Sequence, residues 1–246
     1  MTSILVSHWP PPPAPMVLAD GEVHVWCASL EHPPAPAAEL ADILCEEERA
    51  RAARYQSPSV RHQFMTARGL LRTLLGRYLG CDPCRVAFRL GPQGKPALAG
   101  DRALHFNVSH SHGLALFAVT RHCPVGVDVE QVRPFANDID LAERFFCPPE
   151  TRALRALAPE ARREAFFHVW TRKEAYLKAS GTGLSGGLER VEVSVAPGEP
   201  ARVVRVDGDE GSAGRWSLAA LTPAPGYIGA LALEGHGHRL CCWAWP

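Results

Sequence analysis

The chain of 246 residues is long enough for one large domain or two small ones, and its 46% of hydrophobic residues can supply a full core. Its 26 Lys and Arg residues balance 26 Asp and Glu residues, so no global field would attract nucleic acid or an anionic membrane, and neither is expected as a partner. No apolar run reaches the roughly 18 to 20 residues that span a bilayer, and MTSILVSHWPPPPAP lacks the features of a secretory signal. We therefore expect a cytoplasmic protein whose cysteines are reduced thiols.

Helical and strand-like patterns follow one another along the first half of the chain. The first 38 residues are proline-rich around one strand, EVHVWCASL, and a helical pattern runs from Glu39 to Tyr55. Ser57 and Pro58 supply a cap and a first-turn proline for a second helix, which Gly80 ends. Period-two alternation then predicts the strands VAFRL, LHFNVS, LALFAVT and VGVDVE.

The second half has the same order of elements. Helical patterns at LAERFF and PETRALRAL precede a long helix, REAFFHVWTRKEAYLKAS, which ends at Gly181. The strands LERVEVSV, ARVVRV, WSLAAL, YIGALAL and RLCCWAW follow. Helices followed by strands, twice over, predict an α+β fold of two similar halves, although no clean sequence repeat accompanies them. We expect the halves to be 1–124 and 125–246.

Two carboxylates stand in the apolar strand VGVDVE, residues 125 to 130. Alternate residues of a strand share a face, so Asp128 and Glu130 lie side by side, roughly 7 Å apart at the backbone. Like charges in a partly buried site need a cation or a shared proton. The alternative is the outer face of an edge strand, where both acids would be solvated.

A third acid, Glu174, belongs to the long helix. Helical periodicity places it in the apolar arc of that helix, one turn after Trp170, so we expect it to be buried or half-buried and to need a partner or a metal. The alternative is an exposed helix pair between Glu174 and Lys178. Three carboxylates from a strand and a helix would suit Mg²⁺ with substrate phosphate. The arc contains Phe166, Phe167, Trp170 and Leu177, and the opposite face contains His168, Thr171, Arg172 and Ala175.

Basic and polar residues elsewhere favour a phosphate-bearing ligand. From residue 49 to residue 89 the chain carries a run of arginines, with Asp82 as the only acid, which predicts a cationic surface for a polyphosphate; the alternative is a solvated helix face. Ser109 and His110 are unsuited to a hydrolase pair because neighbours in a strand point in opposite directions, so we expect ligand contacts. The loop GPQGKP, residues 91 to 96, permits close approach of a ligand.

In this order, GPQGKP, FNVSHS, VGVDVE and WTRKEAYLK resemble the 4′-phosphopantetheinyl transferases, specifically the large Sfp-type class in which two similar halves form one chain. The resemblance spans about residues 45 to 190. It implies an enzyme that transfers the phosphopantetheine arm of coenzyme A to a serine hydroxyl of an apo acyl or peptidyl carrier protein and releases 3′,5′-ADP. It also implies a working monomer that serves secondary metabolism.

The resemblance further implies a role for individual residues at the seam between the halves. Mg²⁺, with Mn²⁺ as a substitute, would be held by three acids, and the serine proton would pass to Glu174 or to a metal-bound water. Asp128, Glu174 and Lys178 would be the catalytic residues. The implied metal ligands are Asp128, Glu130 and Glu174, and the implied coenzyme A contacts are Lys178 and Lys173 at the pyrophosphate, Ser109 and His110 at phosphates, Lys95 and Pro96 beside the adenine nucleotide, and Arg68 and Arg51 at the 3′-phosphate.

Two other functions fit part of the pattern. A metal-dependent phosphohydrolase would use the same acids to activate water, but it does not account for four motifs in the order of a transferase. A protein that binds coenzyme A or a carrier without turnover would be expected to lack an acid or the lysine, and none is missing. A carrier protein, commonly acidic, would dock on the arginine-rich second helix, for which we single out Arg72 and Arg77, or on apolar side chains beside it.

Overall fold

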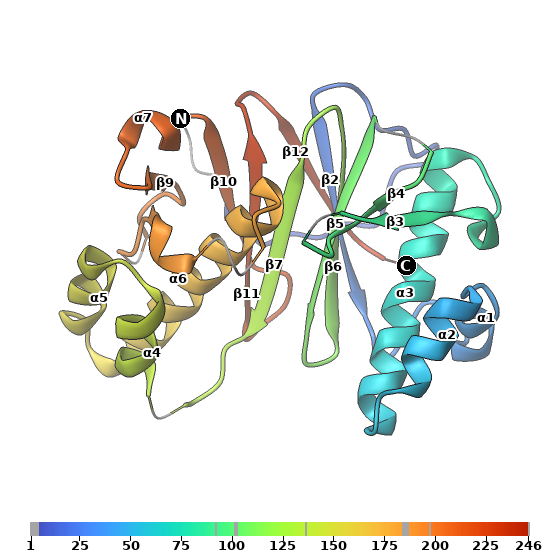
Figure 1. The fold of residues 1–246 in the computed structure, drawn as a ribbon, viewed down its shortest axis with the longest axis horizontal. Coiled ribbons are helices and arrows are strands. Elements are labelled where there is room, and N and C mark those ends of the chain that lie inside the picture. Colours follow the sequence, from blue (N-terminus) through green and yellow to red (C-terminus); the bar gives the residue numbers. More distant parts are fainter. Residues whose placement is uncertain are drawn as a thin grey trace.

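Two four-stranded sheets face each other at the centre of the molecule, and helices cover the outer side of each (Figure 1). The computed structural model describes residues 5–91, 93–100, 103–135, 137–183, 187–196 and 198–245. The predicted α+β fold of two similar halves is confirmed. The elements of the first half are β1 (Leu5–Val6), β2 (Glu22–Ser29), α1 (Ala37–Asp42), α2 (Glu46–Ala53), α3 (Pro58–Leu79), η1 (Pro83–Arg85), β3 (Phe88–Leu90), β4 (Pro96–Leu98), β5 (Leu104–Ser111) and β6 (Leu114–Arg121).

The second half follows the same sequence of elements: a long strand, two short helices, a long helix, a short hairpin and two antiparallel strands. The helices α3 and α6 both have 22 residues, begin with proline and end at a left-handed glycine, Gly80 and Gly181. The elements are β7 (Val125–Gln131), α4 (Asp138–Phe145), α5 (Pro148–Arg155), α6 (Pro159–Ser180), η3 (Leu188–Arg190), β8 (Val191–Val193), β9 (Val203–Val206), α7 (Glu210–Ala213), β10 (Trp216–Leu221), β11 (Tyr227–Glu234) and β12 (Arg239–Ala244).

The two sheets exchange their terminal strands. The order β12-β2-β6-β5 places the last strand beside the first long one, and the order β1-β10-β11-β7 places the first strand in the second sheet. Both added strands pair in parallel, Arg239 with Glu22 and Leu5 with Ala220. The expected boundary between 124 and 125 lies in the turn from β6 to β7, but β1 and β12 cross it, so neither half is one continuous stretch of chain.

Apolar side chains of both sheets form the central core. Val25 of β2 and Leu116 of β6 face Val127 of β7 and Leu231 of β11, and all four are buried. The opposite faces of the sheets pack against α3 and α6. The alternation of each strand therefore divides its side chains between two apolar layers, which explains why these strands have so few polar positions.

Two helical regions differ from what their sequence patterns alone indicate. The pattern from Glu39 to Tyr55 forms two helices, α1 and α2, because Cys45 starts a new helix with a capping box to Glu48. The helix α6 is also buried on the face opposite its apolar arc, where Thr171, Arg172 and Ala175 lie. Neighbouring elements cover α6 on both sides, so its hydrophobic arc alone does not give its exposure.

Within the described ranges, no helix has the length and apolar content needed to cross a membrane.

Candidate active site at the seam of the two sheets

The strands β5 and β7 are edge strands of different sheets, and side chains of β5 join them. Asn107 accepts a hydrogen bond from the amide of Val127, N to Oδ1 2.9 Å. Ser109 Oγ donates to Asp128 Oδ1 at 2.7 Å. These bonds satisfy polar groups on the free edge of β7 and fix its acids against the first half of the chain.

Asp128 and Lys178 form an ion pair where α6 crosses β7. Lys178 Nζ lies 2.7 Å from Asp128 Oδ1, 3.0 Å from Ser109 Oγ and 3.2 Å from the carbonyl oxygen of Val127. Asp128 is only 4% exposed, and its second oxygen, Oδ2, is buried without a hydrogen-bond partner. Burying a carboxylate oxygen without a hydrogen-bond partner costs free energy, and a bound ligand such as a cation would offset this cost.

Glycine at 126 allows this crossing. A Cβ at this position would overlap the carbonyl oxygen of Ala175 and the amide nitrogen of Ala179 on α6. The helix backbone therefore rests directly on β7, and this close approach carries Glu174 and Lys178 to the acids of the strand.

The acids of the site influence one another. Burial, together with the charges of Asp128 and Glu130, raises the pKa of Glu174 to about 7 against the opposing effect of Lys178. Burial and the charge of Asp128 also raise the pKa of Glu130, while the hydroxyl of Ser111 opposes the shift. Glu174 is half-buried, as its place in the helix predicted. The site thus concentrates more negative charge than Lys178 balances.

The residues present suit a hard divalent cation. The donors are carboxylate oxygens, the type that Mg²⁺ prefers, and Asp128 Oδ2 is free to bind one. In the part of the chain that the structure describes, no group of three or more His, Cys, Asp or Glu side chains is already drawn together around an ion position. The charges of Asp128 and Glu130 raise the pKa of Glu174, and the charge of Asp128 raises the pKa of Glu130, so a cation would relieve repulsion among these acids.

Two adjoining cavities lie beside the acids. One of about 320 Å³ is lined by Glu174, Lys178 and Asn107, and it shares Lys95 and Pro96 with a second of about 240 Å³. Lys95 Nζ donates to the carbonyl oxygens of Val125, at 3.1 Å, and of Lys178. Burial, with the charge of Lys178, lowers the pKa of Lys95 to about 8. The loop of the first half therefore closes against the end of α6 and forms one wall of a pocket.

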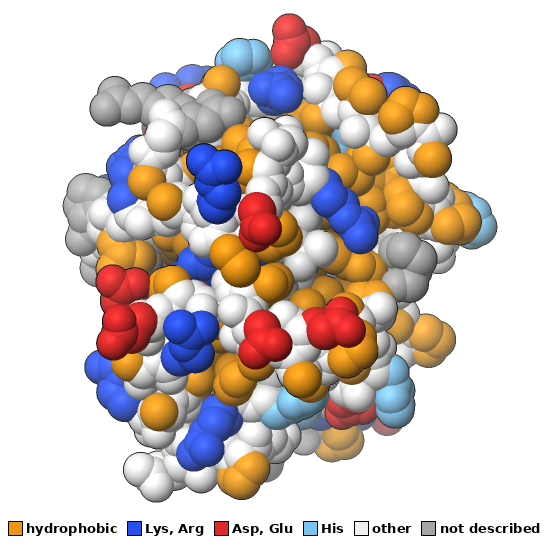
Figure 2. All heavy atoms as spheres, turned by 90° about the vertical axis from the view of Figure 1, so that its right-hand side faces the viewer, with side chains coloured by type: hydrophobic (Ala, Val, Ile, Leu, Met, Phe, Trp, Pro, Cys, Tyr) orange, Lys and Arg blue, Asp and Glu red, His pale blue; other side chains and the backbone are white. Residues whose placement is uncertain are grey.

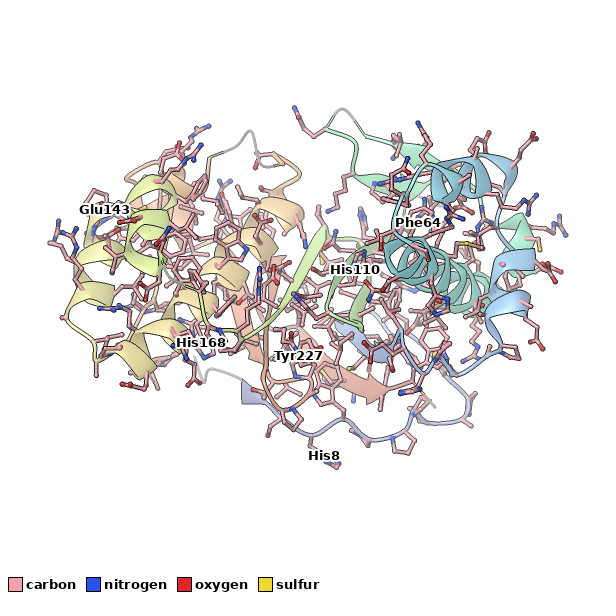
Figure 3. All side chains as sticks on the ribbon, turned by 90° about the horizontal axis from the view of Figure 1, so that it is seen from below. His8, Phe64, His110, Glu143, His168 and Tyr227 are labelled. Atoms are coloured by element: carbon pink, nitrogen blue, oxygen red, sulfur yellow. The ribbon has the colours of Figure 1, made fainter. Side chains whose placement is uncertain are left out.

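The remaining predicted contacts are distributed around this centre. His110 is exposed on β5, between the helices of the two halves (Figure 3). Arg68 belongs to a separate group on α2 and α3, where its Nε lies 2.6 Å from Glu48 Oε1 and its guanidinium covers the ring of Phe88. Arg51 is exposed and covers the ring of Phe64.

Lys173 does not reach the pocket, and its expected role at the pyrophosphate is wrong. Its side chain is fully buried, with Nζ 2.6 Å from Glu150 Oε2 and 2.8 Å from the carbonyl oxygen of Leu188. Arg72 has the matching role in the first half: it lies as far from the start of α3 as Lys173 from the start of α6, and its Nε is 2.7 Å from Glu48 Oε2. Both are structural cations that bind a capping-box glutamate.

The arginine-rich surface is less uniform than predicted. Arg72 is only 2% exposed, so the docking hypothesis is wrong where it relies on this residue. Acidic side chains stand among the basic ones on this side of the molecule (Figure 2), and exposed Glu46 and Glu47 directly precede the arginine run. Arg77 remains exposed and covers the ring of Trp245.

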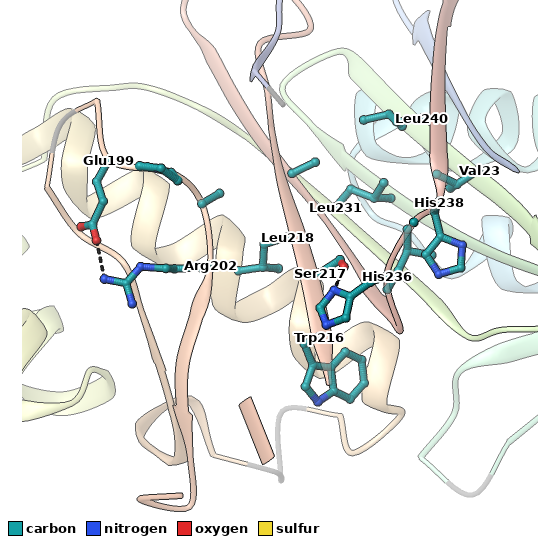
Figure 4. A pocket seen from close by; sticks show the side chains of 15 residues that line it. Val23, Glu199, Arg202, Trp216, Ser217, Leu218, Leu231, His236, His238 and Leu240 are labelled. Atoms are coloured by element: carbon teal, nitrogen blue, oxygen red, sulfur yellow. Dashed lines mark hydrogen bonds and ion pairs between the residues drawn. The ribbon is translucent and has the colours of Figure 1, made fainter. Parts of the chain in front are cut away.

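A larger cavity, of about 820 Å³, lies elsewhere along β10 (Figure 4). Its walls include Leu218, Leu231 and Leu240, with His236 and His238 at one side. None of the paired acids and lysines of the seam lines it, so size alone does not identify the reactive site.

Sequence reasoning missed two residues that hold the site. Asn107 and Ser111 contact β7 from the same face of β5 as Ser109. Period-two spacing within FNVSHS could have shown this, because the three polar residues alternate with Val108 and His110.

Comparisons with known proteins agree along most of the chain. A family described as "4′-phosphopantetheinyl transferase, N-terminal" matches residues 34–122, and the "4′-phosphopantetheinyl transferase superfamily" matches residues 124–232. The 4′-phosphopantetheinyl transferase HetI of Nostoc sp. is 41% identical over 239 residues, which cover 96% of this chain and 97% of HetI. A putative 4′-phosphopantetheinyl transferase of Synechocystis sp., slr0495, is 38% identical over 80% of this chain and 78% of its own length. The transferase Sfp of Bacillus subtilis is 29% identical over 61% of this chain and 66% of Sfp.

Proposed function

Because the chain belongs to the 4′-phosphopantetheinyl transferase superfamily, we propose that the pocket between β5, β7 and α6 is where it moves the phosphopantetheine arm of coenzyme A to a carrier protein. The chain is a 4′-phosphopantetheinyl transferase, and the acceptor is a serine hydroxyl of the apo carrier, with 3′,5′-ADP as the other product. The main support for placing the reaction in this pocket is the ion pair between Lys178 and Asp128, whose second oxygen, Oδ2, is buried without a hydrogen-bond partner.

Three acids would hold the metal ion. The family generally uses Mg²⁺, and Asp128, Glu130 and Glu174 are the proposed ligands, with Mn²⁺ as a substitute. The raised pKa values of Glu130 and Glu174, to which neighbouring acids contribute, support this, since a cation stabilises charges that otherwise repel one another. When bound, the cation would neutralise the oxygens of the attacked pyrophosphate.

Other residues would bind coenzyme A. Lys178 would donate to the pyrophosphate and stabilise the charge of the leaving ADP, for which its half-buried position at the pocket is suitable. Lys95 and Pro96 line both adjoining cavities and would lie beside the adenine nucleotide. The remaining proposed contacts are Ser109 and His110 at the phosphates, and Arg68 and Arg51 at the 3′-phosphate.

Glu174 would accept the proton of the carrier serine. Its carboxylate lines the same cavity as Lys178, where the serine would enter. The serine oxygen would then attack the β-phosphorus of coenzyme A, and the bond from that phosphorus to the oxygen of 3′,5′-ADP would break. Lys178 remains with the leaving side throughout.

We propose that the two halves of the chain supply different groups to the active site. Residues 1–124 would supply the nucleotide contacts and residues 125–246 the metal-binding acids, with β1 and β12 exchanged between the sheets. One chain contains both sides of the pocket, which supports a monomer as the working unit. All eight cysteines are free thiols, which supports a reducing compartment such as the cytoplasm. We propose carriers of secondary metabolism as the acceptors.

The test is the mass of intact apo carriers from fatty-acid, polyketide and nonribosomal-peptide pathways after incubation with the protein, coenzyme A and Mg²⁺. We expect a gain of one phosphopantetheinyl group that Asp128→Ala and Glu174→Ala abolish. Glu143→Ala, a change at an exposed acid of α4, is the matched control and should keep the activity. Release of phosphate products without any carrier gain would instead indicate a phosphohydrolase, and binding without turnover a coenzyme A or carrier-binding protein.

A further inference from the structure

The three polar residues of β5 that face β7 each bind a different group. Asn107 holds the main chain at Val127, and Ser109 holds Asp128. Ser111 Oγ donates to Glu130 Oε2 at 2.8 Å. Ser111 is 8% exposed, so water offers little competition for this bond.

The other contacts of Ser111 determine the direction of its proton. Its Oγ accepts from the amide of Gln131, at 3.3 Å, and that N–H can only donate. His112 Nδ1 lies 3.0 Å from the same oxygen and can donate to the second lone pair. Because the amide of Gln131 only donates and the carboxylate of Glu130 accepts, the single hydroxyl proton points to Glu130, and the Nδ1–H tautomer of His112 is compatible with this arrangement.

Glu130 depends on such a partner more than Asp128 does. Asp128 Oδ1 is held by both Lys178 and Ser109, and its side chain is short. Glu130 has one more rotatable bond, and Ser111 is the side-chain hydrogen-bond partner that the structure gives it. Without that bond, the carboxylate of Glu130 would sample several rotamers.

We propose that Ser111 is a positioning residue, which fixes the carboxylate of Glu130 through one oxygen and leaves the other oxygen available to the metal ion. This inference rests on the proposed function, because it assumes that Glu130 is a metal ligand. Partners that orient metal ligands typically change metal affinity by about 10- to 100-fold when they are removed.

The experiment measures Mn²⁺ binding by electron paramagnetic resonance, with no coenzyme A or carrier present, so that it does not depend on turnover. We expect Ser111→Ala to weaken Mn²⁺ binding by about 10- to 100-fold. Ser111→Thr, which keeps the hydroxyl and suits a strand, should remain within about threefold of the parent. Ser217→Ala is the matched control, since Ser217 lies on β10 and donates to the carbonyl oxygen of Gly235, which follows β11.

Each outcome decides between the two proposals. If Ser111→Ala bound Mn²⁺ as tightly as the parent, or if Ser111→Thr were as weak as Ser111→Ala, Ser111 would have no positioning role. The proposed function would survive either result, since it stands on carrier modification by the parent protein. If the parent protein modified no carrier but bound Mn²⁺ with the expected dependence on Ser111, the proposed function would fail alone. Far-ultraviolet circular dichroism confirms folding of each variant.

Discussion

Lys173 and Lys178 lie on the same helix but have different environments. Lys173 is enclosed by protein and neutralises Glu150, whereas Lys178 faces a pocket from the side of Asp128. The motif WTRKEAYLK places both near the conspicuous Glu174, and nothing in the spacing separates a structural lysine from one that faces a ligand. The difference arises from Glu150, which belongs to α5 and approaches only in the folded chain.

Replacing these two lysines with methionine should therefore give opposite results. Removal of one partner from a buried ion pair costs about 3 to 5 kcal/mol, so Lys173→Met should lower the free energy of unfolding by that amount. Transfer by the molecules that remain folded should stay near the parent rate. Lys178→Met should lose transfer at least about 100-fold, because a charge at the pyrophosphate is lost. Its stability should fall less than that of Lys173→Met, because Lys178 is partly exposed although it pairs with buried Asp128. Urea unfolding and single-turnover transfer measure the two effects; comparable stability losses would contradict the distinction.

Glu174 should make the metal-free protein less stable at high pH. Its pKa is raised from 4.5 to about 7 in the folded protein, so the folded state holds a proton that the unfolded state has released between these values. Stability is therefore lost as the pH rises through this window. Because Glu174→Gln cannot ionise, its free energy of unfolding should exceed that of the parent by about 1 to 3 kcal/mol at pH 8 and should equal it below pH 4.5.

Thermal unfolding in a chelator, from pH 4 to pH 8, tests this. Glu160→Gln, at an exposed position in the first turn of the same helix, is the control and should show no such pH dependence. A constant difference between Glu174→Gln and the parent across the pH range would mean that ionisation is not the cause.

At the scale of elements, periodicity identified most strands and both long helices. Both ends of α3 and the C-terminal end of α6 were predicted correctly because Ser57, Gly80 and Gly181 act locally, whereas α6 begins at Pro159, before the predicted Arg163. The burial of both faces of α6 was not predicted, because helical periodicity does not show which neighbouring elements cover each face. Sequence motifs likewise identified Asp128 and Lys178 but not their distance, which depends on how closely a helix can approach a strand.

Gly126 determines that approach, so Gly126→Ala should separate α6 from β7. The added Cβ would overlap the backbone of Ala175, which a rotamer change cannot relieve. Overpacking of this kind costs about 1 to 3 kcal/mol. Movement of the helix should also weaken coenzyme A binding, since Lys178 moves with it. Gly100→Ala is a matched control because its Cβ would meet no atom within 4 Å. Unfolding and isothermal titration with coenzyme A measure both effects, and a variant that matched Gly100→Ala would refute the close contact.

At the scale of the whole molecule, both halves have the same order of elements, but the three proposed metal ligands all belong to the second half. The second half carries Asp128, Glu130 and Glu174, and the first half contributes β5 and the loop with Lys95. The order of helices and strands in the sequence predicts the two halves. The exchange of β1 and β12 cannot be predicted in this way, because pairing between strands at opposite ends of a chain leaves no local pattern.

The shared core and exchanged strands should make the halves unfold together. Leu231 of β11 is buried against side chains of both sheets, and β12 pairs with β2 across the boundary. Leu231→Ala should cost about 2 to 5 kcal/mol. If unfolding is one transition, hydrogen exchange should accelerate by the same factor in the slowest amides of β2 and β6 as in those of β7 and β11. Mass spectrometry of peptides from each strand measures this. Acceleration confined to β7 and β11 would show that the first half stays folded alone, and the seam would then be a contact between two independent bodies and not part of one core.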